Sequence, residues 1–105
     1  MPRTEPRRFH VRYLRLAEQD LYEVQDYLRR EDPAAALRFV DGLAAALAQL
    51  RAFPKRGPRA RDPVLRARGY RILAVSHYVA VYKIEDADVI IHRVLHGARD
   101  WAKLV

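Results

Sequence analysis

Residues 17–54 have the sequence AEQDLYEVQDYLRREDPAAALRFVDGLAAALAQLRAFP and predict two amphipathic helices in succession. In the first half, apolar residues recur at spacings of three and four positions, which places them on one face of a helix. These residues are Ala17, Leu21, Val24 and Leu28. Arg29 and Arg30 at the end of this pattern complement the helix dipole, although no polar residue stands at the N-cap.

The second helix has a well-marked start and end. Asp32 can cap its N-terminus, and Pro33 suits the first helical position because an N–H is not needed there. The apolar stripe comprises Leu37, Val40, Ala44, Leu47 and Leu50. Phe53 and Pro54 mark the end of the helix. Because only Glu31 separates the two helical patterns, we expect an antiparallel helix hairpin.

Strands are predicted on both sides of this hairpin. Residues 9–14 alternate with the period of two that is typical of a strand, and three later runs are rich in Val, Ile and Tyr. These runs span residues 70–75, 78–84 and 89–95 and are joined by connections short enough for a meander. The order β-α-α-β-β-β predicts a two-layer α+β fold, with the helix hairpin packed on a small antiparallel sheet. Residues 1–105 suffice for one such domain.

The last predicted strand is apolar on both sides. By simple alternation, one face receives Val89, Ile91 and Leu95. The other face receives Ile90 and Val94. A two-layer domain covers only one face of its sheet, so we expect an apolar groove on the second face that fits a partner segment.

The composition excludes several classes of site. The chain contains no cysteine, which rules out disulfides, thiolate nucleophiles and Cys-based metal sites and fits a reducing cytosol. The four histidines show no metal-ligand spacing, and no cofactor is expected. The longest uncharged stretch, residues 72–82, is shorter than the roughly 18 residues of a membrane helix. Residues 1–16 lack the apolar block of a secretory signal, so we expect a cytoplasmic protein without a membrane partner.

Positive charge is concentrated in residues 51–71. This segment holds eight basic residues and one acidic residue, Asp62, and therefore accounts for the whole formal net charge of +7. Its proline and glycine residues predict a long surface loop over residues 54–69. The segment is a candidate surface for an anionic partner such as nucleic acid or an acidic peptide, and an ordinary solvated loop is the alternative.

Several fragments of the chain occur in a characteristic order. They are AEQDL at 17–21, DYL at 26–28, Leu50 with FPKRGP at 53–58, GYR at 69–71, Tyr78 with Tyr82, and RVLHGARD at 93–100. Together they cover nearly the whole chain and resemble the RelE/ParE toxins of type II toxin-antitoxin systems. The last fragment is the most specific and is similar to the ParE branch rather than to the RNA-cleaving members.

The resemblance implies a growth-inhibiting toxin, encoded beside an antitoxin whose C-terminal segment wraps around it in a hetero-oligomer. ParE-like proteins poison DNA gyrase, whereas RelE-like relatives cut mRNA in the ribosomal A site. We therefore expect a gyrase inhibitor of the plasmid-stabilisation type. A ribosome-dependent mRNA endoribonuclease is the alternative, and a third reading is a chain that has lost toxicity and only binds its partner or the operator complex.

Candidate contact residues follow from the basic segment, the open sheet face and the tail. Those expected to contact the target are Arg68, Arg71, Arg93, His96 and Arg99. Those expected to contact the antitoxin are Arg66, Arg68, Arg71, Tyr78, Tyr82 and Ile90. A metal-independent nuclease needs cations and a proton donor or acceptor, and Arg71, Arg93 and His96 are the candidates for these roles. That catalytic set is incomplete, because no lysine pair and no tyrosine beyond Tyr82 accompany it.

Structural roles are the alternatives for the same side chains. His96 precedes a glycine at a predicted strand end, where its imidazole can bond to local backbone. Tyr78 and Tyr82 share a strand face and can be core aromatics instead of partner contacts. Arg71 can form a salt bridge with an acid such as Asp100 instead of contacting a target.

Overall fold

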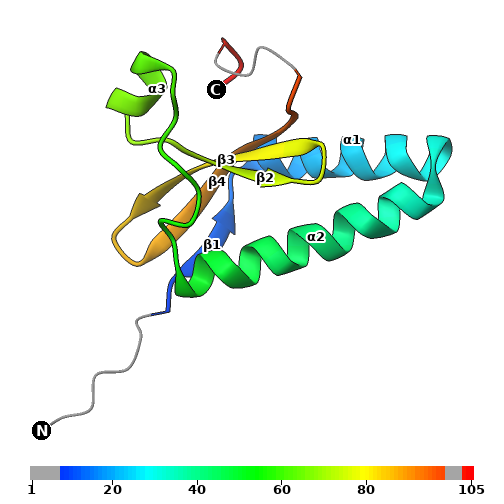
Figure 1. The fold of residues 1–105 in the computed structure, drawn as a ribbon, viewed down its shortest axis with the longest axis horizontal. Coiled ribbons are helices and arrows are strands. Elements are labelled where there is room, and N and C mark those ends of the chain that lie inside the picture. The colour runs from blue at the N-terminus through cyan, green and yellow to red at the C-terminus, as the bar shows by residue number, and fades with distance from the viewer. Residues whose placement is uncertain (1–7, 99–102) are drawn as a thin grey trace, which may run out of the picture.

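The computed structural model describes residues 8–98 and 103–105. Its elements are β1 (His10–Tyr13), α1 (Arg15–Glu31), α2 (Pro33–Ala52), α3 (Pro63–Ala67), β2 (Arg71–Val75), β3 (Tyr78–Glu85) and β4 (Asp88–His96). The two-layer α+β fold is confirmed, since α1 and α2 lie side by side against a four-stranded sheet with the order β1-β4-β3-β2 (Figure 1). Within the described ranges, no helix is long and apolar enough to cross a membrane.

The helix hairpin forms as predicted. A single residue, Asp32, links α1 to α2, and its carboxylate accepts a hydrogen bond from the Ala35 N–H at 3.2 Å. Pro33 occupies the first helical turn. The N-cap of α1 is Leu14, which supplies no side-chain hydrogen bond. Its own N–H donates to the Ile91 carbonyl on β4 at 2.9 Å and ties the start of the helix to the sheet.

The sheet is mixed, so the prediction of a purely antiparallel sheet is wrong. β1 pairs with β4 in parallel, with Val11 opposite Val89 and Tyr13 opposite Ile91. The other two pairings, β2 with β3 and β3 with β4, are antiparallel. A parallel neighbour needs a long connection, and the whole segment from α1 to β3 supplies it here.

A bulge in β4 changes which side chains face the helices. Ile91 lies opposite Tyr82 and Arg93 lies opposite Val81, so His92 is an extra residue in the strand. Beyond this point the alternation is inverted. Val94 joins the core under the helices, and Leu95 lies opposite Val79 on the second face, which is the reverse of the predicted assignment.

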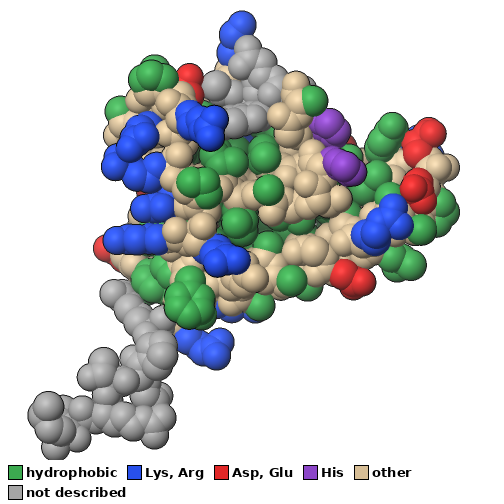
Figure 2. Space-filling view, in the orientation of Figure 1, with side chains coloured by type: hydrophobic (Ala, Val, Ile, Leu, Met, Phe, Trp, Pro, Cys, Tyr) green, Lys and Arg blue, Asp and Glu red, His purple; other side chains and the backbone are tan. Residues whose placement is uncertain are grey.

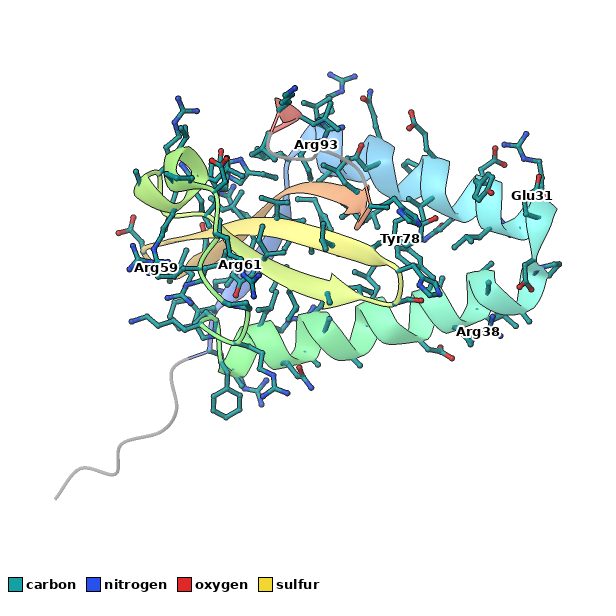
Figure 3. The ribbon with its side chains drawn as sticks, turned by 45° about the horizontal axis from the view of Figure 1, so that its top comes forward. Glu31, Arg38, Arg59, Arg61, Tyr78 and Arg93 are labelled. Atoms are coloured by element: carbon teal, nitrogen blue, oxygen red, sulfur yellow. The ribbon has the colours of Figure 1, made fainter. Side chains whose placement is uncertain are left out.

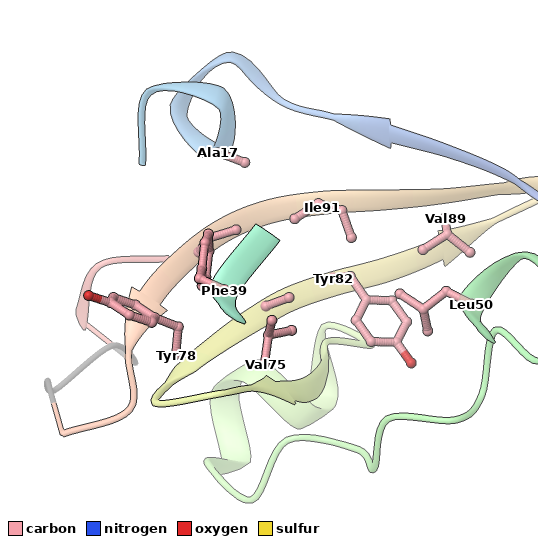
Figure 4. Close-up of a cluster of buried hydrophobic side chains, with 10 residues drawn as sticks. Ala17, Phe39, Leu50, Val75, Tyr78, Tyr82, Val89 and Ile91 are labelled. Carbon is pink, nitrogen blue, oxygen red and sulfur yellow. The ribbon is translucent and has the colours of Figure 1, made fainter. Parts of the chain in front are cut away.

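The main core lies between the helix hairpin and the sheet (Figure 4). Tyr82, Phe39 and Leu50 are among its largest fully buried side chains. The rings of Phe39 and Tyr78 meet edge to face, with their centroids 5.2 Å apart. Tyr78 and Tyr82 are therefore core aromatics, as the structural alternative expected.

The second face of the sheet is covered by the chain itself. Residues 54–69, predicted as a loop, contain the short helix α3, whose Leu65 is buried together with Ala60, Tyr70 and Val81. Val105 packs against the same cluster from the C-terminus. The expectation of an open apolar groove on this face is therefore wrong, because α3 and the C-terminal residue cover it.

Candidate basic binding surface

The eight cations of residues 51–71 lie at one end of the molecule, which we call the basic end. They are Arg51, Lys55, Arg56, Arg59, Arg61, Arg66, Arg68 and Arg71. All are exposed except the partly buried Arg71. Lys and Arg side chains gather over α3 and the segment before it (Figure 2), and Arg59 and Arg61 lie far from Glu31 and Arg38 at the helix turn (Figure 3).

Tyr82 fixes the first half of this segment to the sheet. Its buried hydroxyl donates to the Pro54 carbonyl at 2.6 Å and accepts from the Gly57 N–H at 3.0 Å. Burial raises the pKa of Tyr82, so the hydroxyl remains a proton donor at neutral pH. Gly57 is required at this contact, because a Cβ there would stand 2.6 Å from the Ile72 carbonyl oxygen.

Backbone hydrogen bonds hold the second half of the basic segment, residues 51–71, in place. The Ala60 N–H donates to the Tyr70 carbonyl, and the Ile72 N–H donates to the Pro58 carbonyl. Asp62, the one acid of the segment, caps α3 by accepting from the N–H groups of Val64 and Leu65 at 3.0 Å. The basic end therefore displays its cations from an ordered backbone and not from a loose loop.

The cations of the basic end are not neutralised within the described part of the chain. No ion pair between described residues involves any of the eight. Arginines elsewhere do have partners: Arg12 with Asp88, Arg30 with Asp26, and Arg38 with Asp32. Among the described residues, Arg71 bonds to backbone carbonyls, with Nη1 donating to the Gly57 carbonyl at 2.9 Å and to the Lys55 carbonyl at 3.4 Å. Within residues 8–98 and 103–105, the eight cations therefore have no acidic partner.

Arg93 is not part of this surface. Its guanidinium binds both carboxylate oxygens of Asp20 on α1, at 2.7 and 2.9 Å, and donates to the Leu104 carbonyl at 2.7 Å. The Asp20 carboxylate also accepts from the Val94 N–H, which has no strand neighbour there because β1 has ended. This hydrogen bonding raises the pKa of Arg93. The side chain therefore joins α1, β4 and the C-terminal residues.

His96 lies at the far end of β4. Its Nδ1 accepts from the Ala98 N–H at 3.1 Å, and its ring meets Tyr78 edge to face at 5.4 Å. Arg71 lies opposite Tyr82, whereas His96 lies opposite Tyr78. Those two positions on β3 are about 13 Å apart at the usual rise per residue. Arg71, Arg93 and His96 therefore do not converge on one phosphate.

The aromatic and aliphatic candidates for antitoxin contact are internal. Tyr82 is fully buried, and Tyr78 and Ile90 are less than one-tenth exposed. The helices cover Tyr78 and Tyr82, and α3 and Val105 cover the second face, so none of these three side chains offers an open surface in this structure. Their contact with an antitoxin stays a prediction. Arg66 and Arg68 are exposed, and Arg99 lies outside the described residues, as do Asp100 and Trp101.

One polar cluster escaped prediction from the sequence. On the second sheet face, the Tyr70 hydroxyl is 3.4 Å from His92 Nδ1, and the Lys83 ammonium lies 4.4 Å from the Tyr70 ring centroid. Burial, and then the nearby Lys83, lower the pKa of His92, and Glu85 opposes this shift. The bulge that brings His92 to Tyr70 has no signature in the sequence. Over residues 8–98 and 103–105, no group of three potential metal ligands occurs.

Comparisons with known proteins agree with this architecture. A family model described as the ParE toxin of type II toxin-antitoxin system, parDE, matches residues 11–101. The chain is 29% identical over 98 residues to "Putative toxin Y4kP" of Sinorhizobium fredii, covering 93% of this chain and 98% of that protein.

Two solved structures share the fold. One belongs to the chromosomal ParDE toxin-antitoxin system of P. aeruginosa, with a TM-score of 0.65, 21% identity, and coverage of 86% of this chain and 97% of that one. The other belongs to the RelBE2 toxin-antitoxin complex of Mycobacterium tuberculosis, with a TM-score of 0.54, 23% identity, and coverage of 88% and 94%.

Proposed function

Because the chain belongs to the ParE toxin family of type II toxin-antitoxin systems, we propose that it inhibits growth by binding and poisoning DNA gyrase, without bond chemistry of its own. The contact surface in this proposal is the basic end together with His96. Arg68 and Arg71 are the central cations, and Arg93 acts inside the chain. Arg99 remains a proposed contact on the basis of the family resemblance.

The observation that carries this proposal is the separation of the potential catalytic groups. A metal-independent nuclease must bring cations and a proton-transfer group to within hydrogen-bond distance of one phosphate. Arg93 is bonded to Asp20 and Leu104, Arg71 to backbone carbonyls, and His96 to the Ala98 N–H. This arrangement favours a binding toxin over a ribosome-dependent nuclease.

We further propose that a cognate antitoxin neutralises the toxin by laying an acidic segment over the basic end, at Arg66, Arg68 and Arg71. The free cations supply the charge complementarity for such a segment. Arg68→Glu should weaken the complex by roughly ten-fold or more, because Arg68 is exposed and replacing it introduces a like charge for the acidic segment. Arg30→Glu at the helix turn is the control. Equal antitoxin affinity of both variants would rule out this site.

Purified protein, DNA gyrase and a supercoiled plasmid test the proposed target. We expect linear DNA to accumulate after detergent and protease treatment, because a poison traps the cleaved intermediate. A parallel reaction contains ribosomes with a defined mRNA. An intact plasmid together with codon-dependent cuts in the mRNA would overturn the proposal and favour the nuclease.

A further inference from the structure

The basic end carries an exposed aromatic ring among its cations. Phe53 ends α2 and is 69% exposed. It lines a hollow of about 520 Å³ together with Ala52, Pro54, Lys55 and Arg56. Arg51 lies two positions before it in the chain and is also exposed. An apolar ring in contact with water and flanked by cations is the combination that binds the bases and phosphates of an unpaired strand.

A second hollow extends the same type of surface. It has a volume of about 230 Å³ and is lined by Pro58, Arg59, Arg61 and Ile72. Its backbone is held to the sheet by the Ile72 N–H, which donates to the Pro58 carbonyl, and by the bridge between Arg59 and Arg71. Both hollows therefore combine guanidinium or ammonium groups with apolar atoms on ordered backbone.

We propose that the basic end binds a single strand of DNA, with Phe53 as a stacking platform for one base and with the surrounding cations on the phosphates. These cations are Arg51, Lys55, Arg56, Arg59 and Arg61. The choice of DNA over RNA rests on the proposed action on gyrase, whose cleaved DNA exposes unpaired ends. The toxin would then contact the broken DNA as well as the enzyme.

The chemistry of the basic end favours single-stranded DNA over a DNA duplex or an acidic peptide. A duplex presents phosphates but keeps its bases stacked inside, which leaves Phe53 without a partner. An acidic peptide, as proposed for the antitoxin at Arg66, Arg68 and Arg71, pairs with charges but makes no specific use of an exposed ring such as Phe53. A single strand uses the charges and the ring together.

Fluorescence anisotropy with labelled oligonucleotides of about 20 nucleotides tests the proposal without gyrase. Single-stranded DNA, the matched duplex and the matched RNA are titrated with the full chain at several salt concentrations. If the five cations each meet one phosphate, log affinity for the single strand should fall with log salt at a slope of about −3.5. Arg59→Gln with Arg61→Gln should make this slope shallower by about 1.4.

The stacking role is tested by Phe53→Ala, which should weaken single-strand binding by roughly ten-fold. Tyr22→Ala is the matched control, since Tyr22 is 71% exposed but lies on the acidic helix hairpin. Unchanged thermal unfolding of both variants verifies that they fold. Tighter binding of duplex or RNA, an equal effect of both variants, or no binding at all would overturn the proposal. This binding assay contains no gyrase, so its failure would not count against gyrase poisoning. The plasmid cleavage assay tests that proposal separately.

Discussion

Tyr82 is the residue on which the position of the basic end depends most directly. Its hydroxyl satisfies two backbone groups of the segment after α2, and the tyrosine side chain is fully buried. Tyr82→Phe should lower the free energy of unfolding by about 2 kcal/mol, since the Gly57 N–H and the Pro54 carbonyl lose their partner. Urea denaturation measures this loss. Tyr22→Phe, at an exposed position, should change stability by less than about 0.5 kcal/mol.

Arg93 and Asp20 form the most buried ion pair of the described chain, with side chains that are 17% and 9% exposed. Arg93→Ala should destabilise the protein by about 3 kcal/mol, because it leaves the Asp20 carboxylate buried without its cation. The exposed pair of Arg30 and Asp26 is the control, and Arg30→Ala should cost about 0.5 kcal/mol or less. Equal losses in chemical denaturation would show that the Asp20 pair has no special structural role.

His92 makes stability dependent on pH. Its pKa is lowered in the folded protein, so the unfolded chain binds the proton more readily. The stabilisation from the neutral ring is therefore complete above about pH 6.5, the unfolded value, and decreases as the pH falls toward the lowered folded value. Unfolding free energies at pH 7 and pH 5 should differ more for the natural protein than for His92→Gln. Parallel pH profiles of the two proteins would contradict this role of His92.

At the scale of elements, α3 closes the second face and carries part of the basic end. Asp62→Ala removes the cap of its first turn and should cost about 1 kcal/mol, with faster amide hydrogen exchange at Val64 and Leu65. Asp62→Asn loses the same charge but keeps a capping oxygen, so its exchange should stay slow. Similar exchange rates in both variants would mean that the lost charge, and not the lost cap, determines the order of α3.

The sequence contains the start signal of α3 in the same form as that of α2. Asp62-Pro63 repeats the pattern of Asp32-Pro33, in which an acid caps a helix and proline takes the first turn. The surrounding prolines, glycines and arginines favoured a loop, and the five-residue length of α3 leaves too little periodicity to detect. The two long helices were predictable because their apolar spacing extends over several turns.

Strand partners were harder to predict than strands. Alternation places residues 9–14 in a strand but contains no information on direction, so the parallel pairing of β1 with β4 had no sequence signal. The extra residue His92 inverted the facing of Val94 and Leu95, because one inserted residue exchanges the two faces of everything after it. The expectation of an open groove had two causes: this wrong assignment of faces, and the failure to predict that α3 covers the second face.

At the scale of the whole molecule, charge is polarised. The helix hairpin from Arg15 up to Leu50 holds seven acidic and four basic side chains, whereas residues 51–71 hold one acid and eight bases. The cationic surface was predictable because its residues are contiguous in the sequence. The internal role of Arg93 was not, because its partner Asp20 is 73 positions away in the chain.

If the target binds to the basic end, neutralising cations there should abolish the contact. Neutralising cations elsewhere in the molecule should leave the contact intact. The most direct measurement is the fraction of plasmid that DNA gyrase leaves linear in the presence of the natural protein and two matched double variants. Arg66→Gln with Arg68→Gln should reduce linear DNA roughly ten-fold at a fixed toxin concentration, while Arg29→Gln with Arg38→Gln should leave as much linear DNA as the natural protein does. Equal cleavage by both variants, or no cleavage by the natural protein, would contradict gyrase poisoning through the basic end.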